Sequence, residues 1–228
     1  MKIAIEAQRI FRPNKHGMDF VVLETIRELQ KLDRENEYFI LVSPGADRCL
    51  QDTDNFHIVE VKVPSYPLWE QIGLPLAIRK IKPDLLHCTS NTAPFWCNVP
   101  LVLTLHDIIF LEKRDGSNKS FYQNLGWYYR RLVVPRILPK CRKVITVSEF
   151  EKDNICSKTK LSTDKVIAIH NGYSRHFRMM ENYRNVVDQY VPKGTEYFFF
   201  LGNTDPKKNT KRVLKACLLY TSPSPRDP

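Results

Sequence analysis

The amino-acid sequence predicts an α/β fold, a doubly wound, Rossmann-like parallel sheet. Short β-type runs alternate with longer stretches of helical periodicity almost from the first residue. Several of these runs are apolar nearly throughout, as in strands that helices cover on both faces. Strands separated by helices pair in parallel through crossover connections. A chain of 228 residues suffices for one large domain or two small ones.

Each predicted element rests on its own local pattern. The helix at 20–32 has apolar residues at 22, 23, 26, 29 and 32, which form one helical stripe. The helix at 68–81 starts or breaks at Pro75, because proline fits only the first turn of a helix. Two more helices are predicted at 118–138 and 149–157. Strands are predicted at 2–7, 38–42, 56–63, 84–88, 101–106, 144–147 and 165–170.

The regular pattern ends at residue 170 and resumes only once. Residues 171–195 are polar, aromatic and turn-forming, and we expect a linker there. An apolar strand at 196–201 and a basic helix at 207–217 then begin a second α/β unit. One strand and one helix cannot bury their own apolar faces. We therefore expect a domain at 1–170, a linker at 171–195 and a truncated second domain at 196–216.

Residues 217–228 have a different composition. Three of the chain's 15 prolines lie within six residues here, and the segment resembles a translated sequencing-adapter tail. The alternative interpretation is a disordered, Pro/Ser-rich terminus. We expect this segment to be non-native and to carry no function.

The composition, 43% apolar and 26% charged residues, is that of an ordinary globular protein. The apolar runs are too short to span a bilayer, and an acidic residue follows the N-terminus too soon for a secretion signal. The six cysteines form no Cys-x-x-Cys pair and are expected to be reduced structural thiols. We expect a cytosolic protein.

The positive charge is confined to the second half of the sequence. Residues 1–116 contain 14 Lys/Arg and 16 Asp/Glu, whereas residues 117–217 contain 20 and 8. Such asymmetry favours phosphate-bearing partners: nucleotides, nucleic acid or an anionic membrane. The segment 121–143 interleaves aromatic and basic residues, which suits a bilayer surface, a single-stranded nucleic acid or an ordinary half-buried helix.

Polar residues follow several predicted strands at their carboxyl ends, where ligands bind in parallel sheets. Three of the six histidines are among them or beside them. This placement predicts a polar cleft able to bind hydroxyls, phosphate or a sugar. The candidate residues are Glu6, Arg9, His87, His106, Asp107, Ser148, Asn171 and Gly172.

Most of these candidates also have a purely structural interpretation. Ser148 would cap a helix in a capping box with Glu151, Asn171 and Gly172 would form a turn, and His87 would be a buried, hydrogen-bonded imidazole. His106 beside Asp107 is the strongest candidate, since an imidazole next to a carboxylate can orient, accept or donate a proton.

Two further positions are candidates for phosphate binding. Gly17 offers positive φ and close backbone approach before a helix N-terminus. Asp19 stands where a dinucleotide fingerprint would have its second glycine, so that fingerprint is absent. Lys207 and Lys208 in a first helical turn oppose the helix dipole unless a phosphate lies there, although a solvated face is the alternative.

Taken together, these segments resemble the retaining glycosyltransferases of family 4, which have the two-domain GT-B architecture. YPLWEQ at 66–71 with KPDLLH at 82–87 is similar to the acceptor-domain signature of mannosyltransferase-like members. The other matching segments, in order, are TLHDIIF at 104–110, VSEF at 147–150, HNG at 170–172, FLG at 200–202 and DPKKN at 205–209.

The resemblance implies a function for each part. The N-terminal domain would bind the acceptor, a lipid-linked glycan or polysaccharide, on the inner face of the cell membrane. The C-terminal domain would bind a nucleotide sugar, for which we expect GDP-mannose. Gly17, Gly202 and Lys208 would contact the donor phosphates, and His106 and Asp107 would lie beside the transferred sugar. Transfer would pass through an oxocarbenium-like state, with stabilisation of the leaving diphosphate as the main effect.

The resemblance also has gaps. Met18 and Asp19 follow Gly17 where many members have a second glycine and an arginine, and Asn203 follows Gly202 in place of arginine. The paired glutamates that handle the donor sugar are not found, so we expect this product to be inactive by itself. We expect neither a cofactor nor a metal.

Two other functions remain open. A basic, nucleic-acid-associated α/β protein would bind its partner with a steep salt dependence. A carbohydrate-binding or partner-docking half-domain would bind glycan without binding nucleotide.

Overall fold

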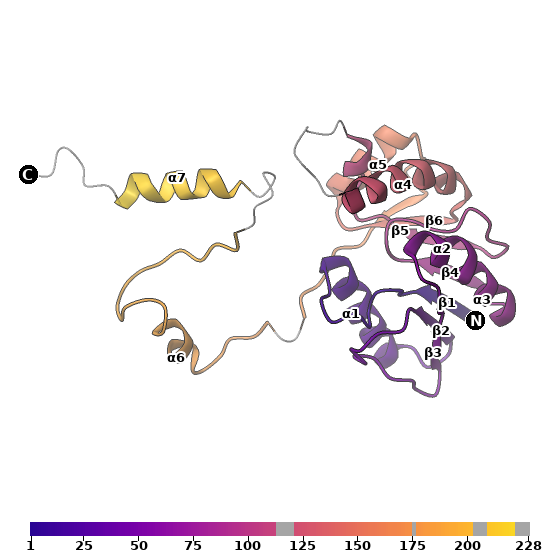
Figure 1. The fold of residues 1–228 in the computed structure, drawn as a ribbon, viewed down its shortest axis with the longest axis horizontal. Helices are drawn as coiled ribbons and strands as arrows, with labels where there is room; N and C mark the ends of the chain where they lie inside the picture. Colours follow the sequence, from indigo (N-terminus) through magenta and orange to yellow (C-terminus); the bar gives the residue numbers. More distant parts are fainter. Residues whose placement is uncertain (113–120, 175–176, 203–208, 222–228) are drawn as a thin grey trace, which may run out of the picture. The chain divides into compact units, whose positions relative to one another are not determined.

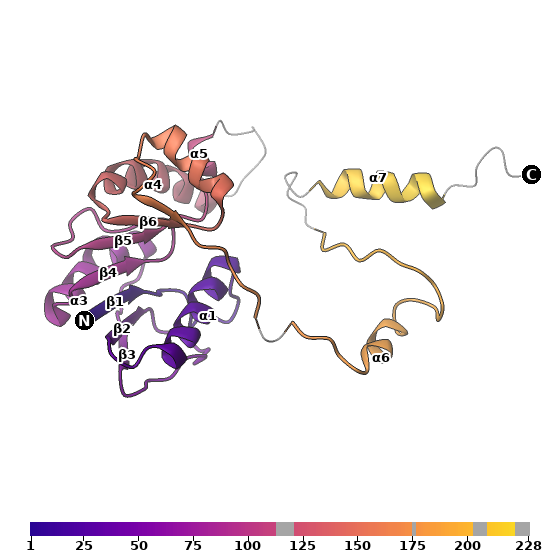
Figure 2. The same ribbon diagram turned by 180° about the vertical axis from the view of Figure 1, so that it is seen from behind.

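A computed structural model of the chain describes residues 1–112, 121–174, 177–202 and 209–221. The chain divides into two compact units, Met1–Ser174 and Arg175–Pro228. Each unit is described separately below, with the first shown from two sides in Figures 1 and 2.

The first unit contains a seven-stranded sheet in which every pairing is parallel. The strand order is β3-β2-β1-β4-β5-β6-β7, so the chain reverses its direction of travel between β1 and β4. This confirms the predicted doubly wound, Rossmann-like sheet. The strands are β1 Lys2–Glu6, β2 Glu37–Val42, β3 Phe56–Glu60, β4 Leu85–Cys88, β5 Leu101–Thr104, β6 Lys143–Thr146 and β7 Val166–Ala168.

The helices of this unit lie between the strands, as the periodicity predicts. Their bounds are α1 Gly17–Leu32, α2 Tyr66–Leu68, a π-helical turn Trp69–Gly73, α3 Leu74–Ile81, a 3₁₀ turn Ile109–Leu111, α4 Phe121–Ile137, a 3₁₀ turn Leu138–Lys140 and α5 Glu149–Thr159. The predicted start of α4 at 118 lies outside the described residues.

The sheet is buried on both faces because its strands alternate between two cores. Ala4 of β1 packs in one core with Trp69, Ile78 and Val133, which come from the π turn, α3 and α4. Its neighbour Ile5 packs in the other core, with Val22, Leu23 and Ile26 of α1. Successive side chains of a strand point to opposite faces, so α1 and the α3–α4 layer cover opposite sides (Figures 1 and 2).

The predicted helix at 68–81 is divided by a π turn. Pro75 lies in the first turn of α3, directly after the π-helical residues Trp69–Gly73. Proline lacks the N–H that an uninterrupted helix needs, and the wider turn accommodates this. The turn places Trp69 and Glu70 in the interior, where both are almost completely buried.

The second unit differs from the prediction in two places. Its described residues contain two helices, α6 Tyr183–Val187 and α7 Thr210–Thr221, and no strand. The strand predicted at 196–201 is therefore wrong. An apolar run forms a strand only beside another strand. Without such a partner the segment stays irregular, and Phe198 is 99% exposed. The helix predicted to end at 217 continues to Thr221, and its predicted start at 207 lies outside the described residues.

Within the described part of the chain, no helix is long and apolar enough to cross a membrane. The same residues contain no cluster of three His, Cys, Asp or Glu side chains suited to a metal ion.

Candidate functional site

Three adjacent strands, β1, β4 and β5, end at the point where the strand order reverses. In doubly wound sheets this switch point is where a crevice forms between diverging loops. Glu6 ends β1, His87 and Thr89 lie at the end of β4, and His106 follows β5. The structure thus brings together Glu6, His87 and His106, which the sequence predicts at neighbouring strand ends.

Glu6 is a buried connector of two of these strands. Its side chain accepts from the backbone N–H of Thr89 at 3.2 Å and of Gln8 at 3.1 Å. The Thr89 hydroxyl donates to the Glu6 backbone carbonyl at 2.6 Å. Because Glu6 is only 1% exposed, it shapes the loop after β4 and does not present its carboxylate to solvent.

His106 is held in a defined tautomer. Its Nε2 lies 3.0 Å from the backbone carbonyl of Thr89, which can only accept, so Nε2 carries the proton. Its backbone N–H donates to Oδ1 of Asn91 at 2.6 Å. Burial lowers the pKa of His106 below its ordinary value, which keeps the ring neutral at pH 7. Nδ1 of the neutral ring is then an acceptor, and no described residue hydrogen-bonds to it.

His87 lies deeper than His106. Its Nε2 is 2.8 Å from the hydroxyl of Thr104, and burial lowers its pKa to about 4. Both imidazoles line a small cavity of about 30 Å³ between the strand ends and α1. The remaining lining residues are Ile5, Val21, Val22, Thr25, Ile26, Thr89 and Thr104. His87 is therefore a hydrogen-bonded, partly enclosed imidazole.

Asp107 and Ser148 take part in local backbone capping. Oδ1 of Asp107 accepts from the backbone N–H of Ile109 at 3.1 Å, at the start of the 3₁₀ turn. Ser148 is the N-cap of α5 and accepts from the backbone N–H of Glu151 at 3.1 Å, as its structural interpretation predicts. The expected capping box is only half formed, because the Glu151 carboxylate accepts from Ile108 instead.

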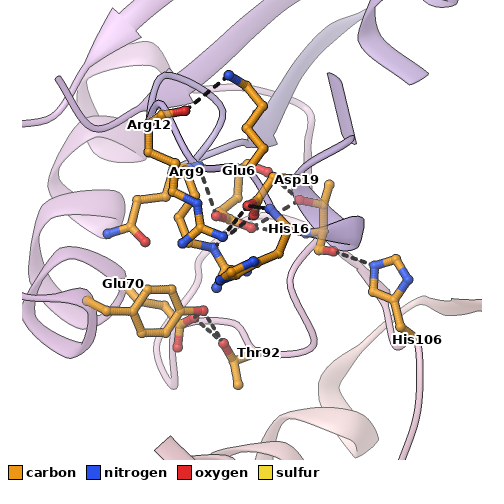
Figure 3. A network of polar contacts seen from close by, with 12 residues as sticks. Glu6, Arg9, Arg12, His16, Asp19, Glu70, Thr92 and His106 are labelled. Atoms are coloured by element: carbon orange, nitrogen blue, oxygen red, sulfur yellow. Dashed lines mark hydrogen bonds and ion pairs between the residues drawn. The ribbon is translucent and has the colours of Figure 1, made fainter. Parts of the chain in front are cut away.

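The N-terminus of α1 is neutralised by the helix's own Asp19. Figure 3 shows Arg9, Arg12 and His16 around this carboxylate. Nε of Arg9 lies 3.2 Å from Asp19, Arg12 forms a second ion pair, and the backbone N–H of His16 donates at 2.8 Å. Gly17 is the first helical residue and lacks the expected positive φ, because the extended N-cap His16 already redirects the chain.

A second buried carboxylate, Glu70, connects the π turn with α2, α4 and the loop after β4. It accepts from the hydroxyl of Tyr66 at 2.8 Å and from that of Tyr129 at 2.6 Å. The hydroxyl of Thr92, which lies beside it in Figure 3, also donates to it. Burial raises its pKa. Gln71 completes the cluster with a bond of 3.0 Å to Glu70.

The Glu70 cluster and the Asp19 cluster are neighbours. The guanidinium of Arg9 lies over the ring of Tyr66 at 5.7 Å and also pairs with Asp19. In the sequence, Glu70 stands out only as part of the YPLWEQ segment at 66–71. Its role had no local signal, because its partners Thr92 and Tyr129 are 22 and 59 residues away.

The remaining predicted site residues are not joined to this group. Asn171 and Gly172 follow β7, two strands beyond β5 in the sheet, and are exposed without forming a turn. Gly202 belongs to the second unit and is exposed. Lys208, like Lys207, lies outside the described residues.

The sequence and the fold of this chain are similar to those of known proteins. The family model described as Glycosyltransferase Family 4 matches residues 16–176. The structure of HepE from Anabaena, in complex with UDP and glucose, is similar with a TM-score of 0.52 and 16% identity, over 83% of this chain and 50% of its own. WaaG, a glycosyltransferase involved in lipopolysaccharide biosynthesis, is similar with a TM-score of 0.57 and 10% identity, over 82% and 50%.

A search of curated proteins finds no significant match. The chain spans half the length of the two solved structures. The family model covers well over half of the sequence, from the start of α1 to beyond the end of β7. This chain therefore belongs to glycosyltransferase family 4.

Proposed function

We propose that this chain forms the acceptor-binding side of a retaining glycosyltransferase that uses a nucleotide-sugar donor. Family membership supports the reaction class. HepE, which has a similar fold, is described in complex with UDP and glucose, and WaaG acts in lipopolysaccharide biosynthesis. A nucleotide-sugar donor and a glycan acceptor are in keeping with both.

The observation that carries this proposal is the state of His106. Its Nε2–H is used by Thr89 and its ring is neutral, so Nδ1 can accept a hydrogen bond from a hydroxyl group. Sugars are rich in hydroxyl donors and carry no charge that would demand an imidazolium. We propose that His106 orients a sugar hydroxyl at the switch point, with Asp107 shaping the turn that holds it.

The donor phosphates would be met by groups with positive potential. Arg9 and Arg12 place two positive charges against the single charge of Asp19 at the start of α1, where Gly17 is exposed. We propose that Lys208 and the backbone at Gly202 serve the same phosphates from the second unit. No cofactor beyond the nucleotide sugar is part of this proposal.

For the sugar and acceptor we propose mannose from GDP-mannose and a lipid-linked or polysaccharide acceptor, at the cytoplasmic face of a membrane. The acceptor-domain signature at 66–87 supports the mannose assignment. Glu6 would act by shaping the loop after β4, and Arg9 and His87 would line the acceptor site.

Substitution of His106 tests the proposal. We expect the chain to bind at least one of mannose, glucose, GDP-mannose and UDP-glucose in calorimetric titration. His106→Ala should weaken that binding about fivefold or more, since one hydrogen bond contributes about 1 kcal/mol. The control is His57→Ala on β3, where the imidazole lies 3.5 Å from Glu37.

Unchanged sugar affinity in His106→Ala, with a normal fold, would overturn the role of this residue. Binding of sugar without any nucleotide binding would instead favour a carbohydrate-binding module.

We further propose that residues 1–228 alone do not transfer sugar. The described part of the second unit has two helices and no strand, and therefore no sheet whose edge could bind a donor. Incubation with labelled nucleotide sugars and membrane lipid extract should leave the label on the donor. Labelled lipid or glycan would contradict this.

A further inference from the structure

The loop that follows β4 is polar and yet buried. The four residues 89–92 are each at most 8% exposed, although loops normally run over the surface of a protein. Buried polar groups destabilise a fold unless they are hydrogen-bonded. Thr89 bonds to Glu6 of β1, and Thr92 bonds to Glu70 of the π turn. Further hydrogen bonds of the loop reach β5 and the residue just beyond it.

Asn91 of this loop has a backbone conformation that few side chains tolerate. Its φ is 68°, in the left-handed region, where a Cβ atom crowds the backbone and asparagine is one of the exceptions. Glycine would adopt the same conformation at no steric cost. A side chain at such a position is useful where it makes a contact that glycine cannot make.

The side-chain amide of Asn91 makes such a contact. The backbone N–H of Asn91 donates to the carbonyl of Thr104 at 3.2 Å, and Oδ1 of Asn91 accepts from the backbone N–H of His106 at 2.6 Å. In a parallel ladder, one residue bonds through its N–H and its backbone carbonyl to two residues of the neighbouring strand. Asn91 repeats this pattern with Oδ1 in place of its carbonyl. Its amide thus adds one more pair to the β4–β5 ladder, beyond Cys88 and Leu103.

The added pair fixes His106 at its backbone, and the same loop fixes its ring. Nε2 of His106 lies 3.0 Å from the carbonyl of Thr89, two residues before Asn91. One fixed point at the backbone and one at the tip of the ring leave the imidazole little freedom to rotate. The loop after β4 therefore sets the direction of Nδ1, to which no described residue bonds.

We propose that Asn91 is a positioning residue, whose side-chain amide holds His106 so that Nδ1 meets a sugar hydroxyl. The inference rests on the proposed function, because a sugar is the ligand proposed for His106. Asn91 would act before any sugar arrives, by reducing the freedom that the ring loses on binding. Its effect should therefore be visible both in the free chain and in the sugar affinity.

Four variants of the full chain separate this role from a general effect on stability. Asn91→Gly keeps the left-handed backbone and removes the amide, whereas Asn91→Asp keeps an oxygen acceptor. Asn55→Gly is the matched control. The Asn55 amide joins segments at the amino ends of β2 and β3, through the carbonyls of Asp33 at 3.0 Å and Asn36 at 2.9 Å. Lys160→Gly, at the end of α5, replaces another residue of left-handed conformation.

NMR of the free chain measures the position of His106 without any ligand. The short bond to Oδ1 should place the backbone amide proton of His106 downfield. Asn91→Gly should move this signal upfield and speed the exchange of the proton with solvent. The ring of this variant should show both neutral tautomers, where the parent shows Nε2–H alone. Asn91→Asp should restore the amide signal, and both controls should give the parental signals of His106.

Calorimetric titration with mannose, glucose, GDP-mannose and UDP-glucose measures the effect on binding. Asn91→Gly should weaken the binding of each probe that the parent binds by about fivefold, because a misplaced Nδ1 forfeits about one hydrogen bond. Asn91→Asp should stay closer to the parent, and the two controls should equal it. If Asn91→Gly does not fold, Asn91→Ser replaces it, since the serine hydroxyl ends one bond short of the position of Oδ1.

Three results would overturn the proposal. The first is a single Nε2–H tautomer with parental sugar affinity in Asn91→Gly. The second is an equal loss in Asn55→Gly, which would show a general effect on stability. The third is an equal loss in Asn91→Asp, because the acceptor oxygen would then be without effect.

The proposed function fails separately, if the parent binds none of the four probes or if His106→Ala binds them as the parent does. The ring signals of Asn91→Gly then still decide whether Asn91 holds His106. Mixed tautomers would support this role, and a single Nε2–H tautomer would contradict it.

Discussion

At the scale of single residues, two imidazoles at the same sheet edge have different environments. His106 is tied to a backbone carbonyl and can offer Nδ1 to a ligand, whereas His87 is hydrogen-bonded to Thr104 below it. Burial lowers the pKa of both rings. His106 is thus suited to binding a ligand. His87 contributes to packing, and its buried neutral ring makes the stability of the fold sensitive to acid.

His87 should make the fold less stable as the pH falls. Its pKa is about 4 in the folded protein and about 6.5 when unfolded, so only the unfolded chain takes up the proton between these values. The contribution is complete above pH 6.5 and is lost towards pH 4, by about 1.4 kcal/mol per pH unit.

Urea unfolding at pH 7 and at pH 4.5, for the parent and for His87→Gln, measures this effect. The parent should lose about 2 to 3 kcal/mol more than the variant over this interval, since the variant has no proton to bind. A stability difference between the two proteins that does not change with pH would contradict the assignment.

Several site residues can be predicted from the sequence, but the residues around them in the fold cannot. Apolar runs locate the strand ends, and so the sequence predicts His87 and His106 at the carboxyl-terminal edge of the sheet. The Glu70 cluster could not be predicted, because its hydroxyl donors come from positions far apart in the chain. The prediction of a positive φ at Gly17 is wrong because the extended N-cap His16 redirects the chain before the helix begins.

At the scale of elements, Glu70 holds the π turn against α2, α4 and the loop after β4. Its removal takes the acceptor from three hydroxyl donors, of which Tyr66 and Thr92 can still bond to each other. We expect Glu70→Ala to lower the free energy of unfolding by about 3 kcal/mol, because each unsatisfied buried group costs about 1 to 3 kcal/mol and partial relaxation offsets some of this.

Glu70→Gln should cost less than Glu70→Ala, since it keeps the side-chain volume and one acceptor oxygen. The exposed Glu35→Ala should have little effect. Denaturant unfolding of the three variants gives the order directly, and equal stability of Glu70→Ala and Glu35→Ala would show that the cluster does not stabilise the fold.

The sequence predicts an element correctly where other elements pair with it and cover its apolar faces. Apolar periodicity located all the strands of the sheet in the first unit because each is covered and paired. The same type of pattern at 196–201 forms no strand, since no described strand lies beside it. Pairing, which the local sequence does not contain, decides between these outcomes.

At the scale of the whole molecule, the first unit holds the proposed sugar site. It contains the switch point, and the family model lies almost entirely within it. We propose that sugar recognition by the chain occurs on this unit.

The most direct test of the central claim, a sugar site at His106, is NMR of the imidazole groups of the full chain at pH 7. The account predicts that His106 is the neutral Nε2–H tautomer. Its ring signals should shift when mannose, glucose, GDP-mannose or UDP-glucose is added, while those of His57 stay unchanged. A protonated or Nδ1–H ring at His106, or no shift there with any of these ligands, would contradict it.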